Sequence, residues 1–259
     1  MKRLLLKLYN IFNYALFDPL SKFQQYKALP VFLANYVKFR KKWDRNNDFS
    51  LLVSDFYITT ADRFRSAGTA KGHYFFQDIW AAKKIFQKKV PIHTDVGSRI
   101  DGFIAHLLPF CEVQYVDIRQ LNNRIENLRF IQGSILNLPF ENESIESLSC
   151  LHVIEHIGLG RYGDPIDPEG HEKSALELMR VLKPGGTLYV GTPVGRERIC
   201  YDAHRVFHPE TIRSMFSNLT LVEFSLIDDK GEQIMRNANM ATGAGCHYGC
   251  GLFEFTKSK

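Results

Sequence analysis

An apolar strand, a glycine-containing turn and the start of a helix follow one another at residues 92–109, and this order constrains the fold more than any other feature of the chain. Asp95 and Gly97 close the strand, the turn ends at Gly102, and a second short strand ends at Asp117. A glycine turn at the carboxyl end of a parallel strand lets a ligand lie against bare backbone. An acidic residue about 20 positions further on is where a nucleoside ribose is held in such folds. The segment therefore predicts a nucleoside-containing small molecule at this edge of a parallel sheet.

Short apolar strands alternate with helical stretches along the chain. We predict strands at 92–96, 113–117, 129–132, 146–151, 187–191, 219–226 and 251–256, and helices at 73–89, 101–109, 173–182 and 208–217. This alternation predicts an α/β fold, a seven-stranded, mostly parallel, doubly wound (Rossmann-like) sheet with ligands at the carboxyl ends of its strands. We assign residues 73–259 to this domain and residues 1–72 to a helical extension.

Basic residues concentrate in that extension. Residues 1–45 hold ten lysines or arginines against two acids, so this segment carries +8 while the other 214 residues sum to −3. It is also rich in leucine and aromatic residues, and its helical pattern breaks at Asp18-Pro19. We expect no bilayer span, which needs roughly 18 uncharged residues, and no signal peptide. Two alternatives stay open: packing on the domain or on a second copy in a homodimer, or peripheral contact with an anionic membrane surface.

The five cysteines indicate a reducing environment. They are few, scattered and odd in number, which does not suit a disulfide framework. We therefore expect a cytoplasmic protein.

Six short motifs follow one another between residues 92 and 195. They are Thr94-Asp95-Val96-Gly97, Val116-Asp117, Ile131-Gln132-Gly133-Ser134, Leu138-Pro139-Phe140, His152-Val153-Ile154-Glu155-His156 and Leu182-Lys183-Pro184-Gly185-Gly186-Thr187-Leu188. Their order and spacing resemble the core of a class I S-adenosylmethionine-dependent methyltransferase. Over about residues 73–259 the chain more closely resembles a methyltransferase-like family known mainly as a domain of unknown function. The motifs that show this second resemblance are Gly72-His73-Tyr74-Phe75-Phe76-Gln77-Asp78, Gly97-Ser98-Arg99-Ile100-Asp101-Gly102-Phe103, Gly158-Leu159-Gly160-Arg161-Tyr162-Gly163-Asp164 and Ala203-His204-Arg205-Val206-Phe207.

This resemblance implies S-adenosylmethionine as the cofactor. The residues expected to contact it are Asp95, Gly97, Ser98, Arg99, Gly102, Asp117, Ile118, Gly133, Ser134, Ile135 and His152. The glycine loop departs from the family pattern, because Arg99 and Asp101 occupy its second and third glycine positions. We expect Arg99 to pair with the methionine carboxylate. Ser134 stands where an aspartate commonly binds the adenine amine.

Methyl transfer needs alignment of acceptor, methyl and sulfur, and often a base that removes the acceptor's proton. Histidine is mostly neutral at pH 7, and the motif after the fourth predicted strand contains two. Our first candidate base is His156 and the second is His204, with Glu155 orienting or polarising either ring. The alternative is that Glu155 and His156 cap the next turn and only shape the cofactor pocket.

A Gly/Pro-rich insert at residues 157–171 follows, and loops of this length usually act as lids or binding elements. We expect Arg161 and Tyr162 of this loop to face the acceptor. Further candidate acceptor contacts are Tyr74, Tyr201 and Arg205, the last suited to an anionic group. We expect no metal: the acidic cluster in the loop is typical of solvated surface, and Cys246-His247-Tyr248-Gly249-Cys250 has no second ligand pair at suitable spacing.

The leading hypothesis is a small-molecule O-methyltransferase that acts on a sugar, or a phosphorylated or nucleotide-linked sugar, of surface glycan biosynthesis. Nucleic-acid methylation is a weaker alternative, because the Asn/Asp-Pro-Pro-Tyr and Pro-Cys motifs of such enzymes are missing, and we expect no nucleic-acid partner. The altered loop at Arg99 and Asp101 also leaves open a non-catalytic, membrane-associated scaffold with a degenerate cofactor site. A dinucleotide site is disfavoured by the later motifs.

Overall fold

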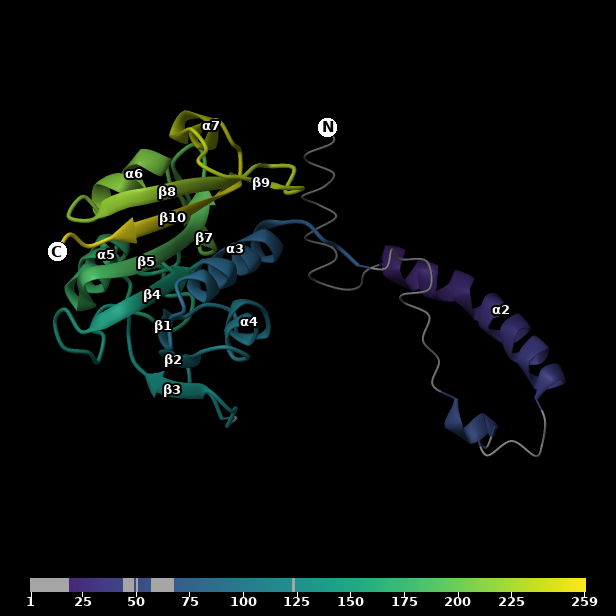
Figure 1. Cartoon of the computed structure of the whole chain (residues 1–259). Helices are drawn as coiled ribbons and strands as arrows, with labels where there is room; N and C mark the ends of the chain where they lie inside the picture. The colour runs from purple at the N-terminus through teal and green to yellow at the C-terminus, as the bar shows by residue number, and fades with distance from the viewer. Residues whose placement is uncertain (1–18, 44–48, 50, 57–67, 123) are drawn as a thin grey trace. The chain divides into compact units, whose positions relative to one another are not determined.

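The computed structural model describes residues 19–43, 49, 51–56, 68–122 and 124–259, and the chain divides into two units, Met1–Thr69 and Ala70–Lys259 (Figure 1). In the first unit, helix α2 (Pro19–Lys42) begins at the predicted break and ends in Arg40, Lys41 and Lys42, whose positive charges suit a helix carboxyl terminus. A short 3-10 turn, η1 (Val53–Asp55), follows. The helix expected before Pro19 lies outside the described residues. Among the described residues, no helix has the length and apolar character that crossing a bilayer requires.

The second unit is built on one eight-stranded sheet in the order β3-β2-β1-β4-β5-β10-β8-β9. Its strands are β1 (Ile92–Val96), β2 (Glu112–Asp117), β3 (Leu128–Gln132), β4 (Ile145–Leu151), β5 (Leu182–Val194), β8 (Thr220–Ile227), β9 (Ile234–Met235) and β10 (Gly249–Thr256). The first five pair in parallel, and β10 runs antiparallel to β5 and β8. The predicted doubly wound sheet is therefore confirmed.

The predicted count of seven strands is wrong by one. The additional strand, β9, has two residues, which pair with Leu226 and Ile227 of β8. A strand of two residues has no alternation of apolar and polar side chains, so periodicity could not reveal it. A separate hairpin pairs β6 (Arg198–Cys200) with β7 (His204–Val206).

Helices cover both faces of the sheet (Figure 1). They are α3 (His73–Gln87), α4 (Ala105–Leu107), α5 (Gly170–Val181), α6 (Pro209–Met215) and α7 (Met240–Ala244), with a π-helical turn, η2 (Ile100–Ile104), before α4. The helix predicted at 101–109 is thus a π turn with a short α segment. Pro209 opens α6 as expected, since it fixes a helical φ where no amide donor is needed.

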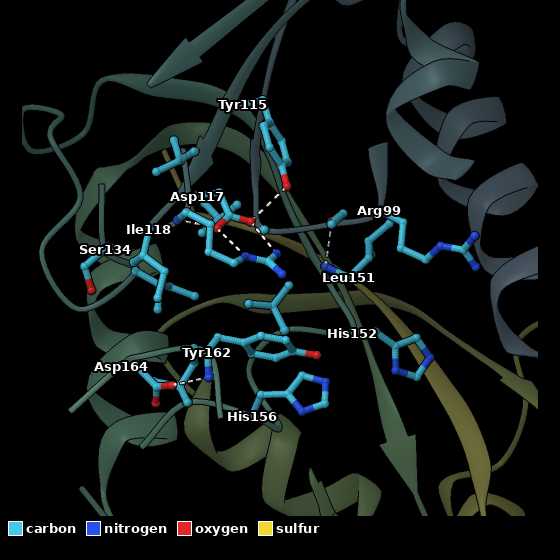
Figure 2. A pocket seen from close by; sticks show the side chains of 18 of the residues that line it. Arg99, Tyr115, Asp117, Ile118, Ser134, Leu151, His152, His156, Tyr162 and Asp164 are labelled. Atoms are coloured by element: carbon cyan, nitrogen blue, oxygen red, sulfur yellow. Dashed lines mark hydrogen bonds and ion pairs between the residues drawn. The ribbon is translucent and has the colours of Figure 1, made fainter. Parts of the chain in front are cut away.

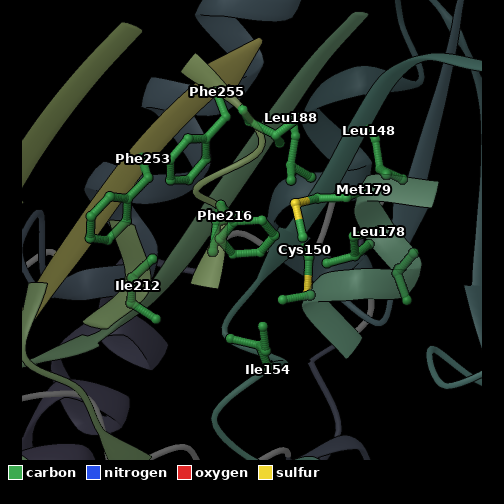
Figure 3. Close-up of a cluster of buried hydrophobic side chains, with 14 of the residues drawn as sticks. Leu148, Cys150, Ile154, Leu178, Met179, Leu188, Ile212, Phe216, Phe253 and Phe255 are labelled. Carbon is green, nitrogen blue, oxygen red and sulfur yellow. The ribbon is translucent and has the colours of Figure 1, made fainter. Parts of the chain in front are cut away.

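Two apolar clusters hold these layers together. On one face, Leu178 and Phe216 from α5 and the end of α6 pack against Cys150 and Phe255 of the sheet, and all four are fully buried (Figure 3). The Phe216 and Phe255 rings lie 5.0 Å apart. On the other face, Trp80 of α3 and Phe103 of η2 are also buried. Because the central strands are covered on both sides, their backbone ends are held in fixed positions for the site.

A partly buried ion cluster attaches α3 to the antiparallel edge of the sheet. Lys84 Nζ lies 2.7 Å from Glu223 of β8 and 2.6 Å from Glu254 of β10. Trp80 Nε1 also donates to Glu223, at 3.0 Å. Burial alone would favour the neutral acid, but Lys84, Ser225 and Trp80 lower the pKa of Glu223 to about 2. This carboxylate therefore stabilises the fold in its charged form.

We expect Glu223→Gln to lower the free energy of unfolding at pH 7 by about 1.5–3 kcal/mol, the usual worth of a hydrogen bond to a charged group. The folded pKa lies below the unfolded one, so the contribution is complete above about pH 4.5 and is lost as pH falls toward 2. Denaturant titrations of both proteins between pH 7 and pH 3 should therefore converge at the acid end. The control is Glu210→Gln, which breaks an exposed ion pair with Arg213 and should change stability little. A constant difference across the pH range would contradict this assignment.

Candidate functional site

The predicted glycine turn is organised by a buried carboxylate. Asp95, fully buried at the end of β1, accepts hydrogen bonds from the Ser98 amide at 2.9 Å and the Ser98 hydroxyl at 2.6 Å, and from the Ser149 hydroxyl of β4. Ser98 Oγ in turn accepts a bond from the Leu151 amide at 3.2 Å. Gly97 has a φ of +73°, and a Cβ there would lie 3.2 Å from Val153. The turn is therefore tied to the end of β4, and Gly97 has a conformation and a close contact that suit glycine.

A cavity of about 350 Å³ lies at the carboxyl ends of β1, β2 and β4 (Figure 2). Of the predicted site residues, those that line it are Tyr74, Gly97, Ser98, Arg99, Asp117, Ile118, Gly133, Ser134, Ile135, His152, His156 and Tyr162. The volume falls in the range of about 300–1,000 Å³ that is typical of small-molecule sites. The fold therefore brings together residues from four separate motifs around one space.

Asp117 faces this cavity at the end of β2 but is already hydrogen-bonded within the protein. Arg119 donates to it from its backbone amide at 2.8 Å and from its guanidinium at 3.0 and 2.7 Å (Figure 2). Tyr115 Oη donates to the same carboxylate at 3.0 Å. Although burial favours the neutral acid, the Arg119 bonds lower the pKa of Asp117. The Arg119 side chain is 56% exposed, so it can move into solvent when another donor takes its place at the buried carboxylate.

A buried carboxylate lies between two histidines beside the cavity. Glu155 is 1% exposed; its Oε1 lies 2.7 Å from His152 Nδ1 and 3.8 Å from His156 Nε2. Burial would raise the pKa of Glu155, but the two imidazoles lower it, so the group is a carboxylate. His156 Nδ1 lies 2.6 Å from the Ala203 carbonyl, to which it donates. The donating nitrogen of His156 is therefore Nδ1, and its lone pair is at Nε2.

The insert at 157–171 is a closed loop rather than a free flap. The Asp167 amide donates to the Gly158 carbonyl at 2.9 Å, and Asp164 Oδ2 accepts from the Gly158 amide at 2.6 Å. A Cβ on Gly158 would lie 1.8 Å from the Asp167 carbonyl oxygen, so only glycine fits this closure. The Tyr162 ring, which lines the cavity, lies against the Arg119 guanidinium at 4.8 Å and the Arg161 guanidinium at 5.1 Å.

Arg205, predicted to meet an anionic acceptor, has its charge directed into the protein. It is 5% exposed, and its guanidinium donates to the carbonyls of Ile157 at 2.7 Å and Pro168 at 3.2 Å. It does not line the cavity at Asp117. The side chain of Arg205 therefore fixes the two ends of the loop, a role that its charge alone did not indicate.

Other predicted site residues also lie outside the cavity lining. They are Asp95, Gly102, Glu155, Arg161, Tyr201, His204 and Arg205. Tyr201 is 78% exposed. His204 packs its ring 6.4 Å from that of His156 and 5.1 Å from Tyr248. A Cβ on Gly102 would lie 2.4 Å from Asp78 Oδ2 of α3, so this glycine serves helix packing.

The structure also places residues at the site that sequence reasoning missed. Arg119 and Tyr115 both bond Asp117, and Val153 lies against Gly97. Arg119 stands two residues after the strand-ending Asp117, and that spacing is a signal which could have suggested the pair. Arg99 lines the cavity, but its guanidinium pairs with Asp101 at 3.0 Å and lies over the Tyr74 ring at 4.8 Å.

A family model described as a Caenorhabditis protein of unknown function, DUF268, matches residues 111–242. The chain belongs to the DUF268 family. No curated protein matches this DUF268 chain in sequence.

Solved structures share its fold at low sequence identity. The cyclase SpnF is 13% identical, with a TM-score of 0.51 over 70% of this chain and 79% of that one. The N-methyltransferase NodS from Bradyrhizobium japonicum WM9, in complex with S-adenosyl-L-homocysteine, is 18% identical, with a TM-score of 0.50 over 71% and 85% of the two chains. The DUF268 chain therefore has the class I S-adenosylmethionine-dependent methyltransferase fold, as the sequence predicted.

Proposed function

We propose that the chain is an S-adenosylmethionine-dependent methyltransferase that acts on a small-molecule acceptor. The observation that carries this proposal is the cavity at the carboxyl edge of the sheet, which has Gly97 and Asp117 on one side and the imidazole of His156 on the other. A carboxylate at the end of β2 suits the two hydroxyls of a ribose, and the glycine backbone permits close approach. The residues present therefore fit an adenosyl ligand.

Binding of that ligand requires Asp117 to exchange partners. Both oxygens of Asp117 now accept bonds from Arg119, so ribose hydroxyls have to replace the guanidinium. The exposed guanidinium then stays over the Tyr162 ring or meets an anionic group of the acceptor. The loop residue Tyr162 and the cation Arg119 thus become the outer wall of the site.

The bound sulfonium supplies an electrophilic methyl group. The chain's residues align the acceptor and remove its proton: as the acceptor oxygen bonds to the methyl carbon, the carbon–sulfur bond breaks and the acceptor proton moves to His156 Nε2. The Glu155 carboxylate, 3.8 Å from that nitrogen, stabilises the imidazolium that forms. The Ala203 carbonyl keeps Nδ1 protonated, which presents Nε2 as the base. Glu155 is thus a positioning residue for His156.

We propose an anionic sugar derivative, such as a sugar phosphate or nucleotide-linked sugar of surface glycan biosynthesis, as the acceptor. Because Arg205 is bound by carbonyl groups, the support for an anion comes from Arg119, which lines the cavity and lies over the Tyr162 ring. Arg161 contacts the same ring from outside the cavity lining. We propose methylation on oxygen because a sugar hydroxyl needs a base such as His156 to take its proton, whereas an amine that is already deprotonated does not.

Asp117→Ala should weaken S-adenosylhomocysteine binding at least 10-fold, because it removes charge-assisted bonds to the ribose worth about 1.5–3 kcal/mol. Arg119→Ala is the matched control: it removes the competing partner of the same carboxylate, so binding should be unchanged or tighter. Isothermal titration calorimetry measures both. If the wild-type chain binds no S-adenosylhomocysteine at millimolar ligand, the cofactor assignment is wrong and the non-catalytic scaffold is favoured.

His156→Ala should lower methyl transfer by about 10²–10⁴-fold, the usual contribution of a general base, while S-adenosylhomocysteine affinity stays unchanged. The comparison is His204→Ala, which alters a ring outside the cavity lining and should cost less than 10-fold. Mass spectrometry of products from a panel of sugar phosphates and nucleotide sugars would report the gain of one methyl group. Full turnover by His156→Ala would remove the proposed base.

We also propose that the amino-terminal unit contacts an anionic membrane surface. Helix α2 contains six lysines or arginines and no acid, and Tyr26, Leu33 and Phe39 are each at least half exposed. Basic side chains beside exposed apolar ones favour attraction to an anionic membrane surface. The full chain should sediment with phosphatidylserine vesicles but not with phosphatidylcholine vesicles. Replacing Arg40, Lys41 and Lys42 with Gln should reduce that binding about 10-fold or more at physiological salt, since each cation adds about 1 kcal/mol. Equal binding by the variant and the wild type would contradict the proposal.

A further inference from the structure

Three side chains distant in sequence converge beside the cavity. His73 begins α3, His152 follows β4 and Cys250 lies in β10, yet one potential ligand atom from each lies within 4.8 Å of the other two. In the part of the chain that the structure describes, no other group of three such side chains converges in this way. The acidic residues of the 157–171 loop are used otherwise: Asp164 accepts from the Gly158 amide and Asp167 from Lys173.

His152 is oriented as a metal ligand would be. Its side chain is 5% exposed, and Nδ1 donates to the Glu155 carboxylate at 2.7 Å. Its other ring nitrogen, Nε2, is buried and has no nitrogen or oxygen partner; the Cys250 thiol is the group that interacts with the ring on this side. A buried polar atom without a partner costs free energy, so it needs an explanation. A histidine whose Nδ1 is held by a carboxylate and whose Nε2 is open is the arrangement by which proteins orient histidine ligands to metals.

The other two side chains complete the group. Cys250 is fully buried and forms no disulfide; its sulfur lies 4.0 Å from Gln77 Oε1 and 3.9 Å from the Gly251 carbonyl, and it also interacts with the His152 ring. The ring of His73 stacks on that of His152 with centroids 5.4 Å apart, and its Nε2 lies 3.2 Å from the Tyr248 carbonyl. One thiol and two imidazoles are a ligand set that favours zinc over oxygen-seeking cations.

We propose that His73, His152 and Cys250 bind a zinc ion, with Glu155 orienting His152 and the fourth coordination position left to water or to the acceptor. Zinc bonds of about 2.3 Å to sulfur and about 2.0–2.1 Å to nitrogen place tetrahedral ligands about 3.5 Å apart. The three ligand atoms, now within 4.8 Å of one another, move closer on binding, and the His73 ring turns out of its parallel stack on His152 so that both imidazoles point at the ion. Three protein ligands with one coordination position left free are the pattern of catalytic rather than structural zinc.

The location gives the ion a use in the proposed function. His152 lines the cavity, so the zinc would lie beside the acceptor, on the side opposite Asp117. There a Lewis acid would lower the pKa of an acceptor hydroxyl or thiol and assist His156. This last step rests on the proposed methyl transfer; the binding of zinc does not.

The test is metal binding by the full chain, read without any turnover. The chain stripped with a chelator should take up one zinc or one cobalt(II) ion, and cobalt should give a near-ultraviolet thiolate charge-transfer band. Cys250→Ser should abolish that band. Cys246→Ser, in a buried and unpaired cysteine four residues away, is the matched control and should keep it. Glu155→Gln should weaken binding about 10–100-fold, the usual effect of losing a carboxylate behind a histidine ligand.

His73→Ala provides a second variant, because this ring is less buried than Cys250 and its loss leaves the core intact. We expect its zinc affinity to fall at least 100-fold with an unchanged circular dichroism spectrum. No stoichiometric metal uptake by the wild-type chain, or a cobalt band that survives Cys250→Ser, would overturn the zinc site. Calorimetry with S-adenosylhomocysteine on the metal-free chain is a separate measurement. Failure of the zinc proposal would therefore leave the cofactor proposal intact, and failure of the cofactor proposal would leave the zinc proposal intact.

Discussion

The site depends on one buried carboxylate, that of Asp95. Its two oxygens bind the amide and hydroxyl of Ser98 and the hydroxyl of Ser149, which joins the turn after β1 to the neighbouring strand β4. Burial raises the pKa of Asp95 to about 6, so a charge there costs stability that these hydrogen bonds offset in part. Because the same network fixes the end of β4 through Leu151, the positions of Gly97 and His152 are set together.

The residues that follow β4 supply the side chains proposed for the chemistry, and the hydrogen bonds of Asp95 hold the end of this strand in place. Glu155 links the two proposed roles, because one of its oxygens, Oε1, lies near the rings of both His152 and His156. His156 lines the cavity, and a ring nitrogen of His152 lies within 4.8 Å of the Cys250 sulfur. A single buried carboxylate thus orients a proposed base and a proposed metal ligand. Removal of Glu155 therefore affects both rings, and the separate readouts of affinity and turnover distinguish the two effects.

Much of the fold followed from the sequence because strong local patterns coincide with it. Short strands rich in apolar and β-branched residues alternate with helical stretches, and the turn at Gly97 needs glycine for its backbone and its contact with Val153. The two-residue β9 left no pattern to detect.

The site was harder to predict from the sequence, because the charge of a residue does not show which group its side chain will contact. In the sequence Arg205 cannot be told from a surface arginine, yet its guanidinium is buried and binds carbonyls of the loop. Cys250 had no visible partner because its neighbours, His73 and His152, come from segments 177 and 98 residues earlier, which only the folded sheet brings together.

At the end of the cavity proposed for adenosine, the Arg119 guanidinium already binds the Asp117 carboxylate. A ligand at this position does not simply add bonds to an empty carboxylate; it substitutes for a guanidinium that already holds both oxygens. The measured affinity is then a difference between two sets of bonds to the same group. Since dissolved salt weakens a half-exposed ion pair more than it weakens neutral hydroxyl bonds, higher ionic strength shifts this exchange toward the ligand.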